Sequence, residues 1–188
     1  MIGSDNVTDF ANTQYTPAGG ITELFETYED IKDWFLEKKI IEKFENLSKE
    51  KEKQYYLELI EYRDLIKNSF FEYVKDNTPL EKLVKKTNTI FLKAKVHPKL
   101  ENEESIYTLN YSIEKNDSNK LLAIIAIEVM KLLNSKYIQY IKKCNNHTCS
   151  LLFVDTSKNH SRRWCSMETC GNRTKVNKFS KKQKELHN

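Results

Sequence analysis

Four cysteines are the residues whose types and spacing most clearly predict chemistry, and the chain has no others. Cys144 and Cys149 form one pair, Cys165 and Cys170 form a second, and four residues separate the members of each pair. Thiolates in two close pairs across one supersecondary unit are the ligand set of a tetrahedral zinc site. The spacing therefore predicts one structural Zn²⁺, because four thiolates leave no coordination position open for a catalytic water.

Three other interpretations of the cysteines stay open. Two disulfides would require an oxidising compartment, but residues 1–5 (MIGSD) have neither the basic start nor the apolar stretch of a signal peptide. An iron–sulfur cluster also takes four thiolates, so the ligand types alone do not separate it from zinc. His147 or His160 could replace one cysteine, although a complete set of four thiolates makes this unnecessary.

The residues between the two cysteine pairs predict a small fold that holds them. We expect a knuckle at 144–149 directly after a helix, a strand at 151–154, a turn at 155–160 and a return strand at 162–166. Cys165 and Cys170 then fall at the start of a last helix, which gives a treble-clef-like finger. Trp164 and Phe153 are expected to form a small core beneath the hairpin. Asp155 is expected to make an Asx-type turn or to bind a neighbouring arginine.

The end of this segment resembles a known family. Cys170-Gly171-Asn172-Arg173, preceded by residues 163–167 (RWCSM), is similar to the CGNR zinc-finger family of bacterial transcription regulators. The likeness extends through Phe153, Asp155, Ser157, Asn159, Arg162 and Lys175, whereas Lys158 stands where the family usually has arginine. Residues 9–13 (DFANT) resemble the Asp-Phe-x-Asn-Thr motif of ABATE, the N-terminal domain that this family pairs with its finger. The resemblance implies a DNA-binding transcription regulator that responds to stress or to an effector.

Charge is distributed unevenly along the chain. Residues 142–188 hold eleven Lys and Arg and three Asp and Glu, a net charge of +8, whereas residues 1–141 carry −4. Such asymmetry predicts a basic end that meets a polyanion, carried by a mildly acidic body. The lysines of residues 181–184 alone are as well explained by a solvated tail.

The candidate nucleic-acid contacts are the basic residues that a metal-held scaffold would orient, namely Lys158, Arg162, Arg163, Arg173, Lys175 and Lys178. Arginine can bridge guanine O6 and N7 or clamp a phosphate, whereas lysine more often neutralises phosphate. Double-stranded DNA follows from the resemblance, because this chemistry would also accept RNA. In a second interpretation, Arg173 stabilises the finger by hydrogen bonds to carbonyls of the strand or knuckle.

The first half of the body is expected to be helical. We expect a short helix or arm over 1–13, a loop over 14–26, a helix after Thr27 and a long amphipathic helix over 48–75. Acidic residues in the first turn after Thr27 suit the positive end of that helix. Thr78, Pro79 and Glu81 predict an N-cap, a first helical residue and a capping box for a helix that runs to about residue 93.

The second half of the body is expected to contain one hairpin and one more helix. Residues 95–113 predict a β-hairpin around 102–104, and the alternation of its second strand predicts half-burial. A helix then runs from about 117 to about 141 and straight into Cys144, as a stem for the finger. Because this helix is apolar nearly all round, it lies in the core or is shared with a second subunit of a homodimer.

Three polar residues of the body are candidates for an effector pocket. Asp9, Asn12 and Arg63 stand beside apolar residues, and they resemble motif positions of the ABATE domain. In the other interpretation, Asp9 and Arg63 form a buried ion pair that fixes the N-terminal arm to the long helix. The sequence leaves both open.

These observations predict a mostly helical α+β protein with three parts: a body over 1–141, a zinc finger over 142–180 and a basic tail over 181–188. The longest apolar run, residues 121–127, is far shorter than the ~20 residues that span a bilayer, so we expect a cytoplasmic protein without a membrane partner. No catalytic motif is present, so we expect no enzyme activity. The alternative function is a protein–protein adaptor whose zinc site is purely structural.

Overall fold

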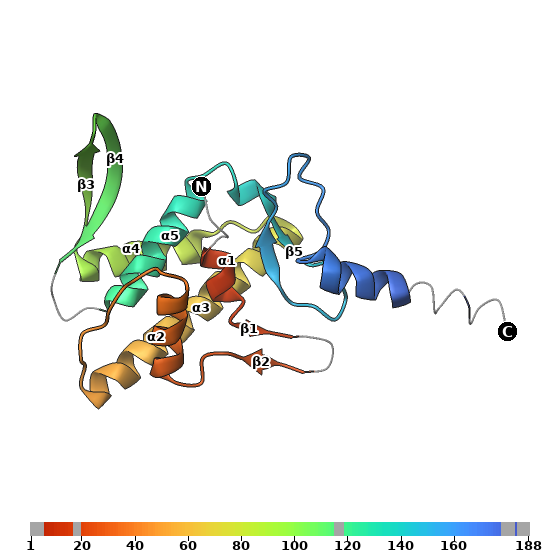
Figure 1. Cartoon of the computed structure of the whole chain (residues 1–188), viewed down its shortest axis with the longest axis horizontal. Helices are drawn as coiled ribbons and strands as arrows, with labels where there is room; N and C mark the ends of the chain where they lie inside the picture. The colour runs from red at the N-terminus through yellow and green to blue at the C-terminus, as the bar shows by residue number, and fades with distance from the viewer. Residues whose placement is uncertain (1–5, 17–19, 115–118, 178–182, 184–188) are drawn as a thin grey trace.

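The computed structural model describes residues 6–16, 20–114, 119–177 and 183. Its helices form a central body, with the cysteine-rich segment at one end and a long β-hairpin at the other (Figure 1). The helices are α1 (Asn6–Ala11), α2 (Tyr28–Glu37), α3 (Lys49–Asp76), α4 (Glu81–Ala94) and α5 (Lys120–Leu133). The predicted mostly helical α+β class is confirmed.

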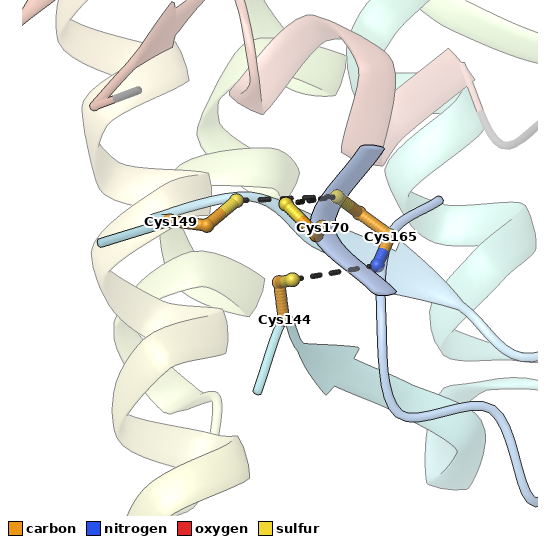
Figure 2. A group of neighbouring side chains, drawn as sticks. All are labelled: Cys144, Cys149, Cys165 and Cys170. Atoms are coloured by element: carbon orange, nitrogen blue, oxygen red, sulfur yellow. Dashed lines mark hydrogen bonds between the residues drawn. The ribbon is translucent and has the colours of Figure 1, made fainter. Parts of the chain in front are cut away.

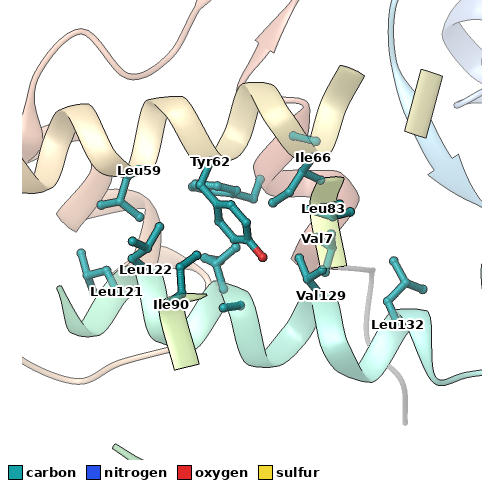
Figure 3. Close-up of a cluster of buried hydrophobic side chains, with 14 of the residues drawn as sticks. Val7, Leu59, Tyr62, Ile66, Leu83, Ile90, Leu121, Leu122, Val129 and Leu132 are labelled. Carbon is teal, nitrogen blue, oxygen red and sulfur yellow. The ribbon is translucent and has the colours of Figure 1, made fainter. Parts of the chain in front are cut away.

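The core lies between α3, α4 and α5, with α1 packed across one end (Figure 3). Leu59 and Ile66 of α3 are fully buried in the same cluster as Ile125 and Val129 of α5. The predicted amphipathic long helix and the placement of the apolar helix in the core are therefore confirmed.

Local signals predicted two helix starts correctly. The Thr27 side chain accepts a hydrogen bond from the backbone N–H of Asp30, whose carboxylate accepts one from the backbone N–H of Thr27, a complete capping box. Ser48 caps α3 through Lys51.

The predicted capping box of α4 is wrong. The helix begins at Glu81 after Leu80, and no side chain caps it. Leu80 packs against the core with a non-helical backbone (φ −84°, ψ 28°), so the helix starts two residues after Pro79, the expected first helical residue.

The predicted helix from residue 117 to 141 is also wrong at its end. α5 stops at Leu133 and is followed by a 3₁₀ turn (Ile138–Tyr140) and strand β5 (Ile141–Lys143). The Ser135 hydroxyl donates to the Leu132 carbonyl and accepts from the Tyr137 N–H. These bonds replace the helical pattern, as serine side chains often do near helix ends. A strand, not a helical stem, therefore enters Cys144.

The described residues also form three antiparallel strand pairs. They are β1 (Gln14–Tyr15) with β2 (Thr22–Glu23), β3 (Val96–Glu103) with β4 (Ile106–Ile113), and β5 with β6 (Leu152–Val154). The first pair lies in the segment 14–26 that the sequence predicted to be a loop.

The predicted hairpin over 95–113 is confirmed, but its predicted half-burial holds only at the root, where Tyr111 and Ile113 are half-buried. Its turn lies at Glu104 and Ser105 and not around 102–104 as predicted, because 102 and 103 still pair with the opposite strand. Both turn residues have positive φ (49° and 69°), as a two-residue hairpin turn requires. Tyr107 and Leu109 of β4 are 74% and 54% exposed. The hairpin projects beyond the helices, so alternation here does not report a buried face.

The β5–β6 pair is the opposite case, because it is short and buried. Ile141, Leu152 and Val154 belong to the main core together with the helices. The finger therefore shares its hydrophobic core with the body. Among the described residues, no helix is long and apolar enough to cross a membrane.

Candidate metal centre

The four cysteine sulfurs converge on one point (Figure 2). All four Sγ atoms lie within 4.8 Å of one another, with Cys149 Sγ 3.9 Å from Cys165 Sγ and Cys165 Sγ 3.6 Å from Cys170 Sγ. Four thiolates bound to one Zn²⁺ at about 2.3 Å lie about 3.8 Å apart. All four are free thiols, and these separations far exceed the roughly 2.05 Å of a disulfide. The cysteines are thus positioned to bind a metal ion.

The first cysteine pair lies on a knuckle that joins β5 to β6. The Cys144 N–H donates to the Leu151 carbonyl (2.9 Å), and the Cys149 N–H donates to the Asn146 carbonyl (2.9 Å), which closes the turn. The knuckle predicted at 144–149 is present, although it follows a strand and not a helix.

Asn146 is a functional residue that the sequence interpretation missed. It is 3% exposed, its Oδ1 accepts from the N–H and the hydroxyl of Thr148, and its Nδ2 donates to the Cys170 carbonyl (3.5 Å). One amide therefore shapes the knuckle and ties it to the second cysteine pair. An asparagine two residues before a threonine in a tight turn was the signal that could have revealed it.

The second cysteine pair lies at the start of a helical segment. Cys165 precedes the N-cap Ser166, whose side chain accepts from the Thr169 N–H, and Cys170 lies in the turn Met167–Gly171 that continues as a helix over 172–177. The predicted helix start is confirmed, whereas the predicted return strand over 162–166 is wrong. That segment contacts the knuckle through two bonds donated by backbone groups, from Asn145 N–H to the Arg163 carbonyl (2.8 Å) and from Cys165 N–H to Cys144 Sγ (3.5 Å). It forms no strand ladder, because β5 is the strand that pairs with β6.

The surroundings of the thiols explain why a cation fits there. Burial, with a smaller contribution from the neighbouring Cys144, raises the pKa of Cys149 to about 11. Burial also raises the pKa of Cys165 well above its usual range, with a contribution from Cys170. At Cys144 burial acts in the same direction, but hydrogen bonds from the backbone N–H groups of Cys165 and Asn146 outweigh it and lower the pKa. A divalent cation would offset the repulsion among these thiolates.

Residues 140–183 match the family model of the CGNR zinc finger. The matched segment begins one residue before β5 and contains all four cysteines. A search of curated proteins finds no match to the chain. The C-terminal part of the protein is therefore a zinc finger with a four-cysteine metal site, and we call residues 140–183 the CGNR finger.

Two apolar side chains expected beneath a hairpin have separate roles in the CGNR finger. Trp164 packs with Leu151 against the cysteine cluster. Phe153 is 7% exposed, and the Arg162 guanidinium lies over its ring, 4.5 Å from the centroid. Of these two side chains, Trp164 belongs to the small core around the metal site and Phe153 does not.

Asp155 organises the loop between the two cysteine pairs. Its fully buried carboxylate accepts from the N–H of Ser157 (3.1 Å), the N–H of Arg162 (2.8 Å) and the Nζ of Lys142 (2.7 Å). The predicted Asx turn is confirmed, but the cation is Lys142 of β5 and not an arginine side chain. Burial alone would raise the pKa of Asp155, yet the hydrogen bond from Lys142 and those from Ser157 lower it well below its usual range.

His160 fixes the same loop from its other end and is not among the metal-site residues. Its Nδ1 lies 2.7 Å from the Asp155 carbonyl oxygen, and its ring stacks on Tyr140 at 3.5 Å between centroids. Lys142 Nζ also donates to the His160 carbonyl (2.5 Å). Nothing in the sequence around Lys142, two residues before Cys144, indicated that this lysine would hold the loop.

The basic residues of the CGNR finger fall into two groups. Arg162 is engaged within the finger, because it donates to the Cys165 carbonyl (2.5 Å) and lies over Phe153. Lys158, Arg163, Arg173 and Lys175 are exposed, as Arg162 is, and the Arg163 guanidinium lies over the Trp164 ring, 5.4 Å from the centroid. Lys178 lies outside the described residues.

The predicted ion pair between Asp9 and Arg63 is wrong. Asp9 pairs with Lys38, whereas Arg63, 1% exposed, binds Glu23 of β2 (2.6 Å) and Asp64 (3.0 Å). The β1–β2 pair, which the sequence did not reveal, brings Glu23 over Arg63. Burial raises the pKa of Glu23, but the hydrogen bond and charge of Arg63, together with hydrogen bonds from Phe25 N–H and Gln14, give a net downward shift.

Asn12 joins the body directly to the CGNR finger. Its Nδ2 donates to the Leu152 carbonyl (2.8 Å) and its Oδ1 accepts from the Leu152 N–H (3.0 Å). Thr16 N–H also donates to the Ser150 hydroxyl (2.7 Å). The side chain of one N-terminal residue therefore pairs with β6 as a neighbouring strand would.

A cavity of about 660 Å³ lies where the body meets the CGNR finger. Asp9 and Asn12 line it from α1 and the turn after α1, and Phe153 and Arg162 line it from the finger. Arg63 is not among its lining residues. The structure thus brings two of the three predicted pocket residues to one cavity and places the third elsewhere.

Proposed function

We propose that this protein is a DNA-binding transcription regulator whose CGNR finger holds one structural Zn²⁺ and contacts duplex DNA. The observation that carries the proposal is the set of exposed cations that the four-cysteine scaffold displays. Arg163, Arg173 and Lys175 lie close in sequence to metal-site cysteines, so a bound metal would fix their backbone.

Zinc is the metal that this donor set supports best. Four thiolates in a closed tetrahedral arrangement are typical of structural zinc sites. Such a site has no open position for water or substrate, which supports a role without catalysis. The metal's contribution would be to hold Cys144 and Cys149 of the knuckle against Cys165 and Cys170 of the helix start.

The DNA contacts are assigned to the exposed residues Lys158, Arg163, Arg173 and Lys175, with Lys178 as the continuation along the chain. Arg162 is excluded from this set because its guanidinium already binds a carbonyl of the finger and covers Phe153. In this arrangement arginine reads base edges or clamps phosphate, and lysine neutralises phosphate.

The regulatory half of the proposal concerns the body. Residues 9–13 resemble the ABATE motif, and Asp9 and Asn12 from this stretch line the cavity at the finger. An effector in that cavity would touch both α1 and the finger, so it could change how Asn12 holds Leu152. This geometry supports effector control of the finger's position.

The DNA-binding proposal is tested by salt-dependent binding to random duplex DNA, followed by fluorescence anisotropy with the metal-loaded full chain. Non-specific affinity should fall steeply with salt, with a slope of about −0.9 per phosphate neutralised. The double variant Arg173→Ala/Lys175→Ala should reduce the magnitude of the slope by about 2.

The matched control is Lys82→Ala/Lys85→Ala, which removes the same charge from the exposed face of α4 in the body. This control should bind as the wild type does. Absence of binding at low salt, or binding that does not depend on salt, would contradict the proposal and favour a protein–protein adaptor.

A further inference from the structure

The β3–β4 hairpin carries an apolar face that no described part of the chain covers. Register places Pro98 opposite Tyr111 and Leu100 opposite Leu109, and residues directly opposite in an antiparallel pair point to the same face. Tyr107, two residues from Leu109 on β4, lies on that face as well. Leu100, Tyr107 and Leu109 are 75%, 74% and 54% exposed. We call this surface the hairpin apolar face.

The hairpin apolar face continues a surface that packs inside the molecule. At the root of the hairpin, Val96 and Ile113 pair on the same face and pack against the main core. Beyond that pair the strands extend past the helices into solvent (Figure 1). The outer part of the hairpin therefore has an apolar face but no described segment that covers it. A two-stranded hairpin alone is only marginally stable in water.

The charges of the hairpin lie on its other face. His97, Lys99 and Glu101 alternate with the apolar residues, and Lys99 pairs with Glu101 at 2.8 Å. The hairpin apolar face has no cation that could bind phosphate and no charge that would select a charged protein. Its chemical complement is another uncharged apolar face of similar size.

We propose that a second copy of this chain binds the hairpin apolar face, so that two hairpins pack face to face about a two-fold axis. The five outer residues expose roughly 550 Å² per copy, so a pair would bury at most about 1,100 Å², which is the size of a weak, reversible interface. A two-fold contact uses the same surface on both copies, as this geometry requires. The hairpin lies at the opposite end of the molecule from the finger, so the dimer leaves both fingers accessible.

This dimer does not use α5. The apolar residues of α5 that could have served a subunit contact are buried in the core, with Ile125 and Val129 fully covered. Dimerisation is measured on the metal-loaded chain without DNA, so its result does not depend on the proposed DNA binding.

Sedimentation velocity of the full chain, from about 1 to about 200 μM, tests the proposal. The wild type should change from monomer to dimer within this range. Leu109→Lys, which places a charge on the hairpin apolar face, should raise the dissociation constant at least about 100-fold. Thr108→Lys adds the same charge to the neighbouring residue on the polar face and should keep the wild-type constant.

A second measurement guards against misfolding of the variant. Hydrogen exchange of α3 and α5 should be unchanged in Leu109→Lys, while the amides of residues 96–113 should be protected in the wild type only at high concentration. A wild-type chain that stays monomeric throughout the range overturns the proposal. So does a Leu109→Lys dimer as strong as that of the wild type.

Discussion

The hairpins β3–β4 and β5–β6 differ in length and burial in opposite ways. β3–β4 has eight residues in each strand and projects into solvent, whereas β5–β6 has three in each and lies in the main core. We therefore do not expect the number of ladder hydrogen bonds to decide which strand pair is more stable. The short pair is fixed by the helices on one side and by the cysteine cluster beyond its ends.

The contrast predicts that the stability of each strand pair in this protein depends on the side chains that cover it. Hydrogen bonds in a solvated ladder largely exchange with water, so each contributes little net free energy. Buried apolar side chains such as Leu152 contribute far more. We accordingly expect the two hairpins to respond very differently to the same kind of perturbation.

Metal removal should give the largest difference between the two hairpins. Loss of the ion, by chelation or by Cys149→Ser, removes binding free energy on the order of 10 kcal/mol that is coupled to folding of the finger. Amide exchange of 141–143 and 152–154 should rise by orders of magnitude, because the knuckle joins these strands. Amides of 96–103 and 106–113 should not change.

Hydrogen-exchange mass spectrometry of loaded and chelated protein at one fixed low concentration would measure this difference. Returned Zn²⁺ should restore slow exchange in the chelated wild type but not in Cys149→Ser. Equal exchange of β5–β6 with and without metal would mean that the helical core alone holds the pair.

Leucine truncation should give the next largest difference. Leu152→Ala removes a side chain that is 1% exposed and should lower the free energy of unfolding by about 3 kcal/mol. Leu100→Ala makes the same chemical change at a residue that is 75% exposed and should cost less than about 0.5 kcal/mol in dilute, monomeric protein. Urea unfolding of both metal-loaded variants gives the two values, and similar costs would refute the proposed basis of the contrast.

Asp155→Asn should have the smallest of the three effects and a defined pH dependence. The change leaves Lys142 without its carboxylate, at a cost of about 2 kcal/mol, since the lysine side chain is 30% exposed and only Asp155 is fully buried. The pKa of Asp155 is lowered in the folded state, so its stabilisation is complete above the unfolded pKa of about 4. The stabilisation is lost as pH falls from there towards the folded pKa.

The difference in unfolding free energy between wild type and Asp155→Asn should therefore be constant from neutral pH down to about 4 and shrink below it. Measuring a difference cancels the acid-driven loss of metal that both proteins share. Ser157→Ala removes one other donor to the same carboxylate and serves as a milder comparison. A difference that grows on acidification would contradict the assigned role.

Sequence reasoning succeeded where the determining interactions are local. The types and spacing of the four cysteines predict the metal site. Thr27 and Ser48 each cap a helix by accepting a hydrogen bond from the backbone N–H three residues later. In each case the information lies within a few residues.

Sequence reasoning failed where the interacting residues are far apart in the sequence. Glu23 binds Arg63 and Asn12 binds Leu152, and the second pair is separated by 140 residues. The pairing of β5 with β6 could not be seen because Ile141–Lys143 is too short and too basic to read as a strand. The exposed hairpin shows the reverse failure, since alternation indicates an amphipathic strand but not whether anything covers it.

Because the finger shares its core with the body, a graft of the finger onto another protein must include more than the segment that holds the cysteines. A graft that begins at Cys144 would deliver every ligand but leave behind Ile141 and Lys142, and with them one strand and the counter-charge of Asp155. The smallest portable unit starts near residue 140, and its new host would have to offer an apolar groove for Leu152 and Val154 and an amide in the place of Asn12.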